Sequence, residues 1–261
     1  MNADFDHIAN NYDAEFTQSL VGKAQRELVS THLDNLIPDW NGLEVLELNC
    51  GTGEDALYFG QKGASVLATD ISSEMVKVAK IKNREQNNVQ CKQMDILDIL
   101  SQMGSKKFDL IFSNFGGLNC LNQTELKQFL DTSKKLLRPN GKLIMVVMPK
   151  FCVWESVYFL AKLQLKKAFR RKIKKGVLAN VDGKDVRTYY YSPLQFVKWA
   201  KAFKMEFVAP IGLFIPPSYL NSLFLKKDKM IEKMREIDKK QADSFHLSGL
   251  SDHFFISFTL R

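Results

Sequence analysis

The 261-residue sequence lacks the features that mark several classes of protein. No apolar run approaches the roughly 20 residues that cross a bilayer, and no Gly-Lys-Ser/Thr motif marks a P-loop. The polar first 13 residues resemble neither a signal peptide nor a transit peptide. The four cysteines and four histidines form no C-x-x-C pair and no cluster, so we expect no metal site and no disulfide framework. Scattered, reduced thiols predict a cytoplasmic location.

Excess positive charge is concentrated in one segment. The chain holds 37 basic and 29 acidic residues, and residues 150–175 contain nine of the bases with one acid, Glu155. A neutral remainder argues against DNA as a partner. A helical projection puts Leu165, Ala168 and Phe169 opposite most of the bases, as in a solvated cap helix. Residues 162–175 are alternatively suited to an anionic surface or an acidic partner.

Between residues 43 and 148, strand signals alternate with helix signals, which predicts βαβ units and a parallel sheet. Strands are expected at 43–48, 64–69, 89–93, 108–113 and 142–148. Helices are expected at 21–35, 53–61, 72–85, 123–137, 193–202 and 223–240. Two more strands are expected, near 206–210 and at 254–260.

Polar or glycine-rich segments follow the first four strands. Residues 47–53 read Glu-Leu-Asn-Cys-Gly-Thr-Gly and open a helix, so backbone can approach a ligand at the helix N-terminus. Asp70 ends the second strand, where a carboxylate can accept both hydroxyls of a ribose. Asp95-Ile96 follows the third strand and residues 113–117 follow the fourth. Ligands of open α/β sheets bind at these strand ends.

These segments resemble the class I S-adenosylmethionine-dependent methyltransferases of the small-molecule type. The matching text is VLELNCGTGEDAL, VLATDISSEMVKVAK, MDI, FDLIFSNFG and LLRPNGKLIMVV, over about residues 40–148. Tyr12-Asp13 extends the resemblance towards the start of the chain. The family usually has a glycine where Asn49 stands, and asparagine tolerates a left-handed backbone better than most residues.

The resemblance implies an α/β fold, with a Rossmann-like, mostly parallel sheet of seven strands whose last strand is antiparallel, plus a helical cap insert. Four regions are expected. They are an N-terminal helical lid (1–40), an S-adenosylmethionine-binding core (41–149), a basic helical cap insert (150–192) and a C-terminal completion of the sheet with substrate-side loops (193–261).

The resemblance also implies which residues hold the cofactor, S-adenosyl-L-methionine, and its product S-adenosyl-L-homocysteine. Those expected around the methionine moiety and the reactive methyl are Tyr12, Glu47, Asn49, Cys50, Gly51, Thr52, Gly53, Ser113, Asn114 and Phe115. Those expected around the ribose and adenine are Asp70, Ile71, Met75, Asp95 and Ile96.

Methyl transfer is an in-line displacement in which the enzyme mainly supplies proximity and alignment. A base is needed only if the acceptor loses a proton, and His253 and His246 are the catalytic candidates. The acceptor-side candidates are Asn119, Trp154, Tyr158, Tyr190 and Phe214. Each of these residues also has an ordinary structural interpretation, as a strand edge, a helix cap or a core residue.

We therefore expect methyl transfer to a small-molecule acceptor, with secondary metabolism as one setting. The first alternative is a methyltransferase whose lipid or carrier-bound substrate docks through the basic cap. The second is a non-catalytic or RNA-binding protein on the same fold. Nothing in the sequence indicates an oligomeric state.

Overall fold

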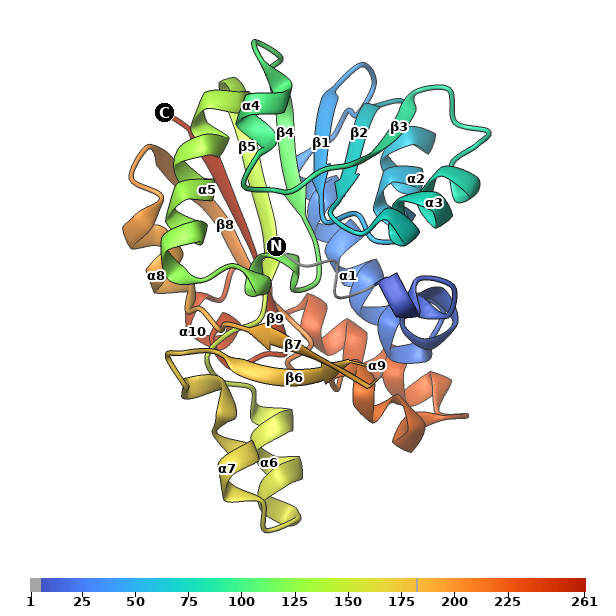
Figure 1. The fold of residues 1–261 in the computed structure, drawn as a ribbon. Coiled ribbons are helices and arrows are strands. Elements are labelled where there is room, and N and C mark those ends of the chain that lie inside the picture. The colour runs from blue at the N-terminus through green and yellow to red at the C-terminus, as the bar shows by residue number, and fades with distance from the viewer. Residues whose placement is uncertain (1–5, 182) are drawn as a thin grey trace.

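A seven-stranded sheet organises the computed structural model, which describes residues 6–181 and 183–261 (Figure 1). The strand order is β3-β2-β1-β4-β5-β9-β8, and β6 and β7 form a separate hairpin. The strands are β1 (Glu44–Leu48), β2 (Ser65–Asp70), β3 (Val89–Gln93), β4 (Phe108–Ser113), β5 (Leu137–Val147), β6 (Val177–Val181), β7 (Lys184–Thr188), β8 (Phe203–Ile211) and β9 (His253–Leu260). Five residues of the expected N-terminal lid, 1–5, lie outside the described residues.

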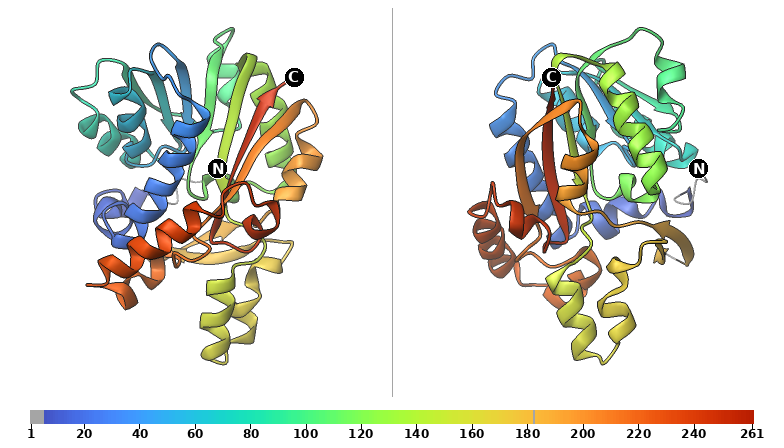
Figure 2. Two further views of the ribbon diagram at one scale, coloured as in Figure 1. Left: turned by 180° about the vertical axis from the view of Figure 1, so that it is seen from behind. Right: turned by 90° about the vertical axis from the view of Figure 1, so that its left-hand side faces the viewer.

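Helices cover both faces of the sheet (Figure 2). The helices are α1 (Leu20–Leu36), α2 (Glu54–Gln61), α3 (Ser73–Lys82), α4 (Ile99–Met103), α5 (Gln123–Leu136), α6 (Val153–Ala161), α7 (Leu165–Ala168), α8 (Pro193–Trp199), α9 (Asp228–Lys239) and α10 (Phe245–Ser248). Helices α4, α5 and α8 pack on one face, and α1, α2 and α3 pack on the other. Within the described ranges, no helix is long and apolar enough to cross a membrane.

The predicted fold class is confirmed. Strands β1 to β5 are parallel, and the last strand, β9, runs antiparallel between β5 and β8. Central strand β5 shows why its sequence is a continuous apolar run. Leu143 and Met145 enter the core on one face, whereas Ile144 and Val146 enter the core on the other, as expected for a strand covered on both sides.

Several element boundaries differ from the predicted ones. Strand β5 begins at Leu137 rather than 142, because Leu137 already pairs with Phe108 before residues 138–141 bulge out of the ladder. Helix α4 had no counterpart among the predicted elements. The predicted helix 223–240 divides into a 3-10 turn, Ser218–Phe224, and α9.

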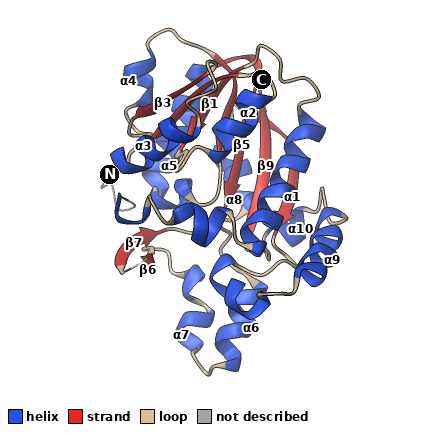
Figure 3. Cartoon of the chain, turned by 90° about the vertical axis from the view of Figure 1, so that its right-hand side faces the viewer, coloured by secondary structure: helices blue, strands red, loops and turns tan. Residues whose placement is uncertain are grey.

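The insert after β5 contains more than helices. Helices α6 and α7 form a short antiparallel pair, and the β6–β7 hairpin follows them, beyond the strand ends of the sheet (Figure 3). The single amphipathic helix assumed in the projection of residues 162–175 does not form. The backbone adopts a positive φ of 57° at Leu163, and α7 ends at Ala168. The basic side chains of this segment therefore point in several directions.

Candidate functional site

One large cavity lies at the carboxyl ends of β1, β2 and β4. Its volume is about 640 Å³, and its walls come from the N-terminal segment, the strand ends of the core and the insert. Residues far apart in sequence, such as Tyr12, Asp70, Arg171 and His253, share this cavity. It therefore has two ends, called below the core end, formed by the strand ends, and the cap end, formed by the insert and the start of β9.

The turn after β1 is held in a left-handed conformation. Asn49, Gly51 and Gly53 have φ values of 46°, 52° and 77°, so the expected tolerance of Asn49 for this geometry is confirmed. The Nδ2 of Asn49 donates to the carbonyl of Asn114 at 3.0 Å, and the Ser113 hydroxyl donates to Asn49 Oδ1 at 2.8 Å. A glycine could not make these bonds. Asn49 thus ties the end of β1 to the end of β4.

Asp70 sits at the end of β2 against this turn. Its two carboxylate oxygens accept backbone N–H groups from Gly51 and Ser72, each at 2.9 Å. Burial raises the pKa of Asp70, and these N–H donors oppose the shift. The carboxylate lines the cavity beside the apolar side chains of Ile71 and Met75. An acceptor of hydrogen bonds next to an apolar wall suits a ribose with its attached base.

Glu47 lies behind the turn rather than in the cavity wall. The residue is 1% exposed, and its Oε2 has no hydrogen-bond partner among the described residues. Burial, reinforced by the nearby Asp55, raises the pKa of Glu47 well above its ordinary value. A neutral or proton-sharing carboxyl is therefore favoured at this position.

Arg26, on α1, is a cavity residue that sequence reasoning missed. Its Nη1 pairs with Asp55 Oδ1 at 2.6 Å, while Asp55 Oδ2 accepts from the Asn114 amide at 2.9 Å. Burial alone would lower the pKa of Arg26. Attraction and hydrogen bonding from Asp55 outweigh burial, so the pKa of Arg26 is raised above its ordinary value. The buried Nε has no partner among the described residues. The core end thus presents a fixed cation, which no sequence motif indicated.

Four aromatic rings form a row from the N-terminal segment to β9. Tyr12 and Phe16 have ring centroids 5.5 Å apart, Phe16 and Phe115 are 5.4 Å apart, and Phe115 meets His253 edge-on at 5.4 Å. Burial raises the pKa of Tyr12 to about 12, so it stays a neutral phenol. All four residues line the cavity, where they form an apolar band between its two ends.

A buried ion cluster forms the cap end. Arg170 binds Glu155 through two hydrogen bonds, of 2.8 and 3.0 Å. Arg171 bridges Glu155 Oε2 at 3.1 Å and Asp252 Oδ1 at 2.8 Å. His253 Nδ1 lies 3.2 Å from Asp252 Oδ2, an ion-pair distance without aligned hydrogen-bond geometry.

The charges of this cluster support one another. Burial opposes ionisation of both acids, but hydrogen bonding and attraction from Arg170 and Arg171 lower the pKa of Glu155. His253 and Arg171 likewise hold the pKa of Asp252 far below its ordinary value against burial. The only acid in the basic segment, Glu155, thereby neutralises part of that segment. A lone acid on an apolar helix among nine bases was the available sequence signal.

The structure separates the predicted site residues into two groups. Those that line the cavity are Tyr12, Asn49, Cys50, Gly51, Thr52, Asp70, Ile71, Met75, Ile96, Asn114, Phe115, Tyr190 and His253. Those that lie outside its lining are Glu47, Gly53, Asp95, Ser113, Asn119, Trp154, Tyr158, Phe214 and His246. Missed lining residues include Arg26, Glu155, Arg170 and Arg171.

Several residues outside the lining have structural contacts instead. The Asn119 amide donates to the Met148 carbonyl at 3.2 Å and accepts from the Met148 N–H at 2.9 Å, which fixes the loop after β4. Trp154 Nε1 donates to the Phe214 carbonyl at 3.0 Å. His246 is exposed on α10. Within the described ranges, no group of three or more His, Cys, Asp or Glu side chains is placed to hold a metal.

Comparisons with known proteins agree with this geometry. Residues 45–141 match the profile of a family described as a methyltransferase domain. A demethylmenaquinone methyltransferase of Clavibacter sepedonicus is 27% identical over 144 residues, which are 55% of this chain and 56% of the relative. A malonyl-[acyl-carrier protein] O-methyltransferase of Hamiltonella defensa subsp. Acyrthosiphon pisum is 36% identical over 100 residues, 38% of this chain and 36% of the relative.

The magnesium protoporphyrin IX methyltransferase of Synechocystis PCC 6803, solved with bound SAH, shares the fold with a TM-score of 0.59. It is 16% identical, and the match covers 93% of this chain and 86% of that one. The chain spans about half the length of the first curated relatives it matches.

A sheet of this order, with a glycine turn after β1 and an acid at the end of β2, defines a Rossmann-like protein that binds a ligand at its strand ends. Residues 45–141 match a methyltransferase domain, and the fold as a whole is that of an S-adenosylmethionine-dependent methyltransferase solved with bound SAH. The chain is therefore similar to the class I S-adenosylmethionine-dependent methyltransferases.

Proposed function

We propose that this protein transfers a methyl group from S-adenosylmethionine to a small-molecule acceptor and releases S-adenosylhomocysteine. The observation that carries the proposal is the single cavity of about 640 Å³ that joins Asp70 at the core end to His253 at the cap end. Both ligands need to lie in one enclosed space, because in-line displacement requires the acceptor to face the methyl group. The cofactor supplies a methyl group activated by its sulfonium charge.

The residues at the core end suit this cofactor chemically. Asp70 would accept the ribose hydroxyls, with Ile71 and Met75 beside the base. Arg26 would bind the methionine carboxylate, since Asp55 holds its guanidinium at the core end of the cavity. Glu47 would support the turn from behind and not by direct contact.

The cap end suits an acceptor with an aromatic body. Phe159, Tyr190 and Tyr219 line it together with His253, and such rings bind planar apolar ligands. His253 would take the proton of an acceptor that must lose one. Asp252, kept anionic by Arg171, would stabilise the resulting imidazolium.

A carrier-bound acceptor is the second candidate. The relative from Hamiltonella is named for acting on an acyl-carrier protein substrate, and the lysines of residues 162–175 would attract an acidic carrier. Methyl transfer from labelled S-adenosylmethionine into a fractionated cell extract tests both candidates. Label in the small-molecule fraction is the expected result. Label confined to protein or RNA would contradict the small-molecule proposal.

Calorimetry with S-adenosylmethionine and S-adenosylhomocysteine tests the cofactor assignment. Both should bind the wild-type protein. Asp70→Asn should weaken both affinities about tenfold or more, because a charged hydrogen-bond acceptor is worth about 1.5–3 kcal/mol. The matched control is Asp131→Asn, an exposed acid on α5 that pairs with Lys134. His253→Gln should keep the cofactor affinity and lose methyl transfer. An Asp70→Asn protein that binds like wild type would remove Asp70 from the site.

A further inference from the structure

We propose that the tip of the α6–α7 hairpin docks on an anionic lipid bilayer. The hairpin tip is defined here as Leu160, Leu163 and Leu165 with Lys162, Lys166 and Lys167. Figures 1 and 2 show that α6 and α7 project from the rest of the molecule, so the tip can meet a flat surface without a collision. This interaction is separate from methyl transfer and does not depend on it.

The apolar side chains of the hairpin tip are strongly exposed. Leu163 is 88% exposed, Leu165 63% and Leu160 40%, and Val157 one turn earlier on α6 is 58% exposed. Single exposed leucines are common on protein surfaces, but contiguous ones mark an interaction site. These four residues lie within nine positions of one hairpin.

The backbone conformation at the hairpin tip is one that leucine rarely adopts. Leu163 has a φ of 57°, a left-handed conformation that glycine or asparagine adopts at much lower cost than leucine. An exposed turn built only for stability would use one of those residues. A strained, exposed leucine at the outermost turn indicates that its side chain is retained for contact with something outside the chain.

The charge around these leucines is basic and uncompensated. Residues 150–175 contain seven lysines, and in the described part of the chain none of them forms an ion pair. The two arginines of the segment behave differently, because both bind Glu155 inside the cap end. The three tip lysines, Lys162, Lys166 and Lys167, are exposed beside the leucines of the hairpin tip.

An apolar tip flanked by three exposed lysines matches the chemistry of an anionic membrane surface. The leucines would enter the interface, while the lysine stems extend along it and their ammonium groups reach the anionic headgroups. A second copy of the chain is a poorer occupant, because two such tips would bring like charges together. An acidic protein would attract the lysines, but it would also need an apolar pocket for Leu160, Leu163 and Leu165, whereas a bilayer receives all three without one.

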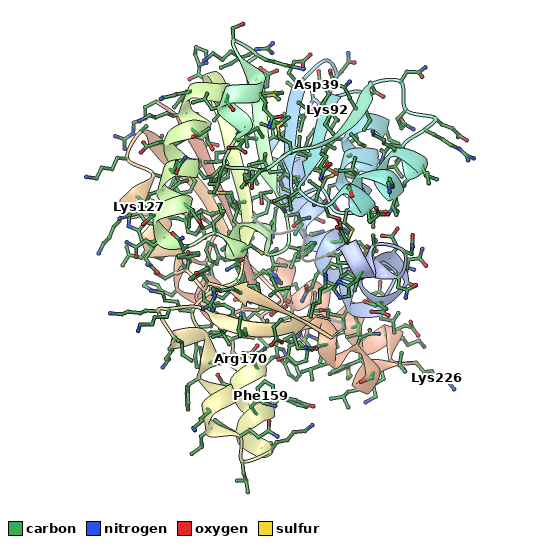
Figure 4. All side chains as sticks on the ribbon, viewed as in Figure 1. Asp39, Lys92, Lys127, Phe159, Arg170 and Lys226 are labelled. Carbon is green, nitrogen blue, oxygen red and sulfur yellow. The ribbon has the colours of Figure 1, made fainter. Side chains whose placement is uncertain are left out.

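The hairpin can hold its tip in a fixed position relative to the cavity. The Gln164 N–H donates to the Phe159 carbonyl at 2.8 Å, and the Ser156 hydroxyl donates to the Ala168 carbonyl at 2.9 Å. Figure 4 shows Phe159 and Arg170 on the hairpin between its tip and the body, and both residues line the cavity. A docked tip would therefore place the cap end of the cavity near the bilayer.

Vesicle cosedimentation at low ionic strength tests the proposal. The protein should bind vesicles of phosphatidylcholine mixed with phosphatidylglycerol, should not bind phosphatidylcholine alone, and should dissociate at high salt. Leu163→Ser with Leu165→Ser, and separately Lys166→Gln with Lys167→Gln, should each lower the partition coefficient about tenfold or more.

Matched controls lie on α8 and in the turn that follows it, away from the hairpin. Leu194→Ser with Val197→Ser, both exposed residues, and Lys198→Gln with Lys201→Gln should leave binding unchanged. Leu163→Gly separates an effect on docking from an effect on folding. Glycine suits the positive φ at this position, so the melting temperature should stay the same or rise, while binding to vesicles falls.

Three results would overturn the proposal. They are equal binding to the two kinds of vesicle, wild-type binding by the tip variants, and a solution dimer that Leu163→Ser abolishes. No cofactor is needed in this experiment, so its failure would leave the proposed methyl transfer untouched.

Discussion

The two ends of the cavity use buried carboxyl groups in opposite ways. Behind the turn at the core end, Glu47 is buried without a bonded cation, and its pKa is raised well above the ordinary value. At the cap end, Glu155 and Asp252 are as deeply buried, but Arg171 touches both and their pKa values are lowered. Burial alone therefore does not decide the charge of an acid. A bonded cation does.

The basic segment shows the same contrast within one stretch of chain. Arg170 and Arg171 turn inward to the acids of the cap end, whereas Lys166 and its neighbours stay at the surface. A guanidinium offers several donors in a fixed plane and can bridge two carboxylates, which an ammonium does less well. Neutralising the arginines would consequently test the interior and not the surface charge.

The largest expected effect comes from breaking the cap end. Arg171→Met should lower the free energy of unfolding by about 3–5 kcal/mol, because it leaves buried carboxylates without their cation. Urea denaturation measures the change. Lys166→Met on the same segment is the matched control and should change it by less than about 0.5 kcal/mol. If both substitutions lowered the free energy of unfolding equally, the buried Arg171 would contribute no more to stability than the exposed Lys166, and the comparison would fail.

The two ends should also respond oppositely to pH. The lowered pKa values of Glu155 and Asp252 add stability that is present above the ordinary carboxyl range and is lost as the pH falls. The raised pKa of Glu47 has the opposite effect. Its contribution to the free energy of unfolding is fully present below the ordinary carboxyl range and is lost as the pH rises.

Glu47→Gln tests the pH dependence assigned to Glu47, and its expected effect on the free energy of unfolding is smaller than that of Arg171→Met. At pH 8 and without cofactor, the variant should gain about 1 kcal/mol over wild type, because glutamine is neutral at every pH and folding then no longer has to protonate the carboxyl or bury its charge. The gain should shrink towards pH 4, where wild-type Glu47 is protonated. Urea denaturation across this range measures it, and a gain that grows as the pH falls would contradict the assigned direction.

Local patterns predicted the core end well. Strands β3 and β4 have the predicted bounds, and the left-handed turn at Asn49 and the position of Asp70 followed from motif and spacing. These features depend on neighbours in sequence or on adjacent parallel strands. The ion cluster of the cap end was not predicted, since Glu155 and Arg171 lie in one insert, Asp252 lies far from them in sequence, and no spacing rule connects the three.

Periodicity also failed where the backbone changes direction. The helical projection of residues 162–175 assumed regular φ and ψ angles, but Leu163 and the end of α7 interrupt them. The β6–β7 hairpin was missed for another reason, because its strands have only five residues each and Val186 is the one apolar residue of β7.

The sequence alone was sufficient for the sheet, its glycine turn, the place of Asp70 at the end of β2 and the concentration of positive charge in one insert. It could not say which of those charges are neutralised. That depends on which distant acids fold against them, and the free energy of a buried ion falls steeply with the distance to its partner. Tertiary packing placed Arg170 and Arg171 against Glu155 and Asp252 and left the lysines to solvent, because only the arginines reach the acids of the cap end.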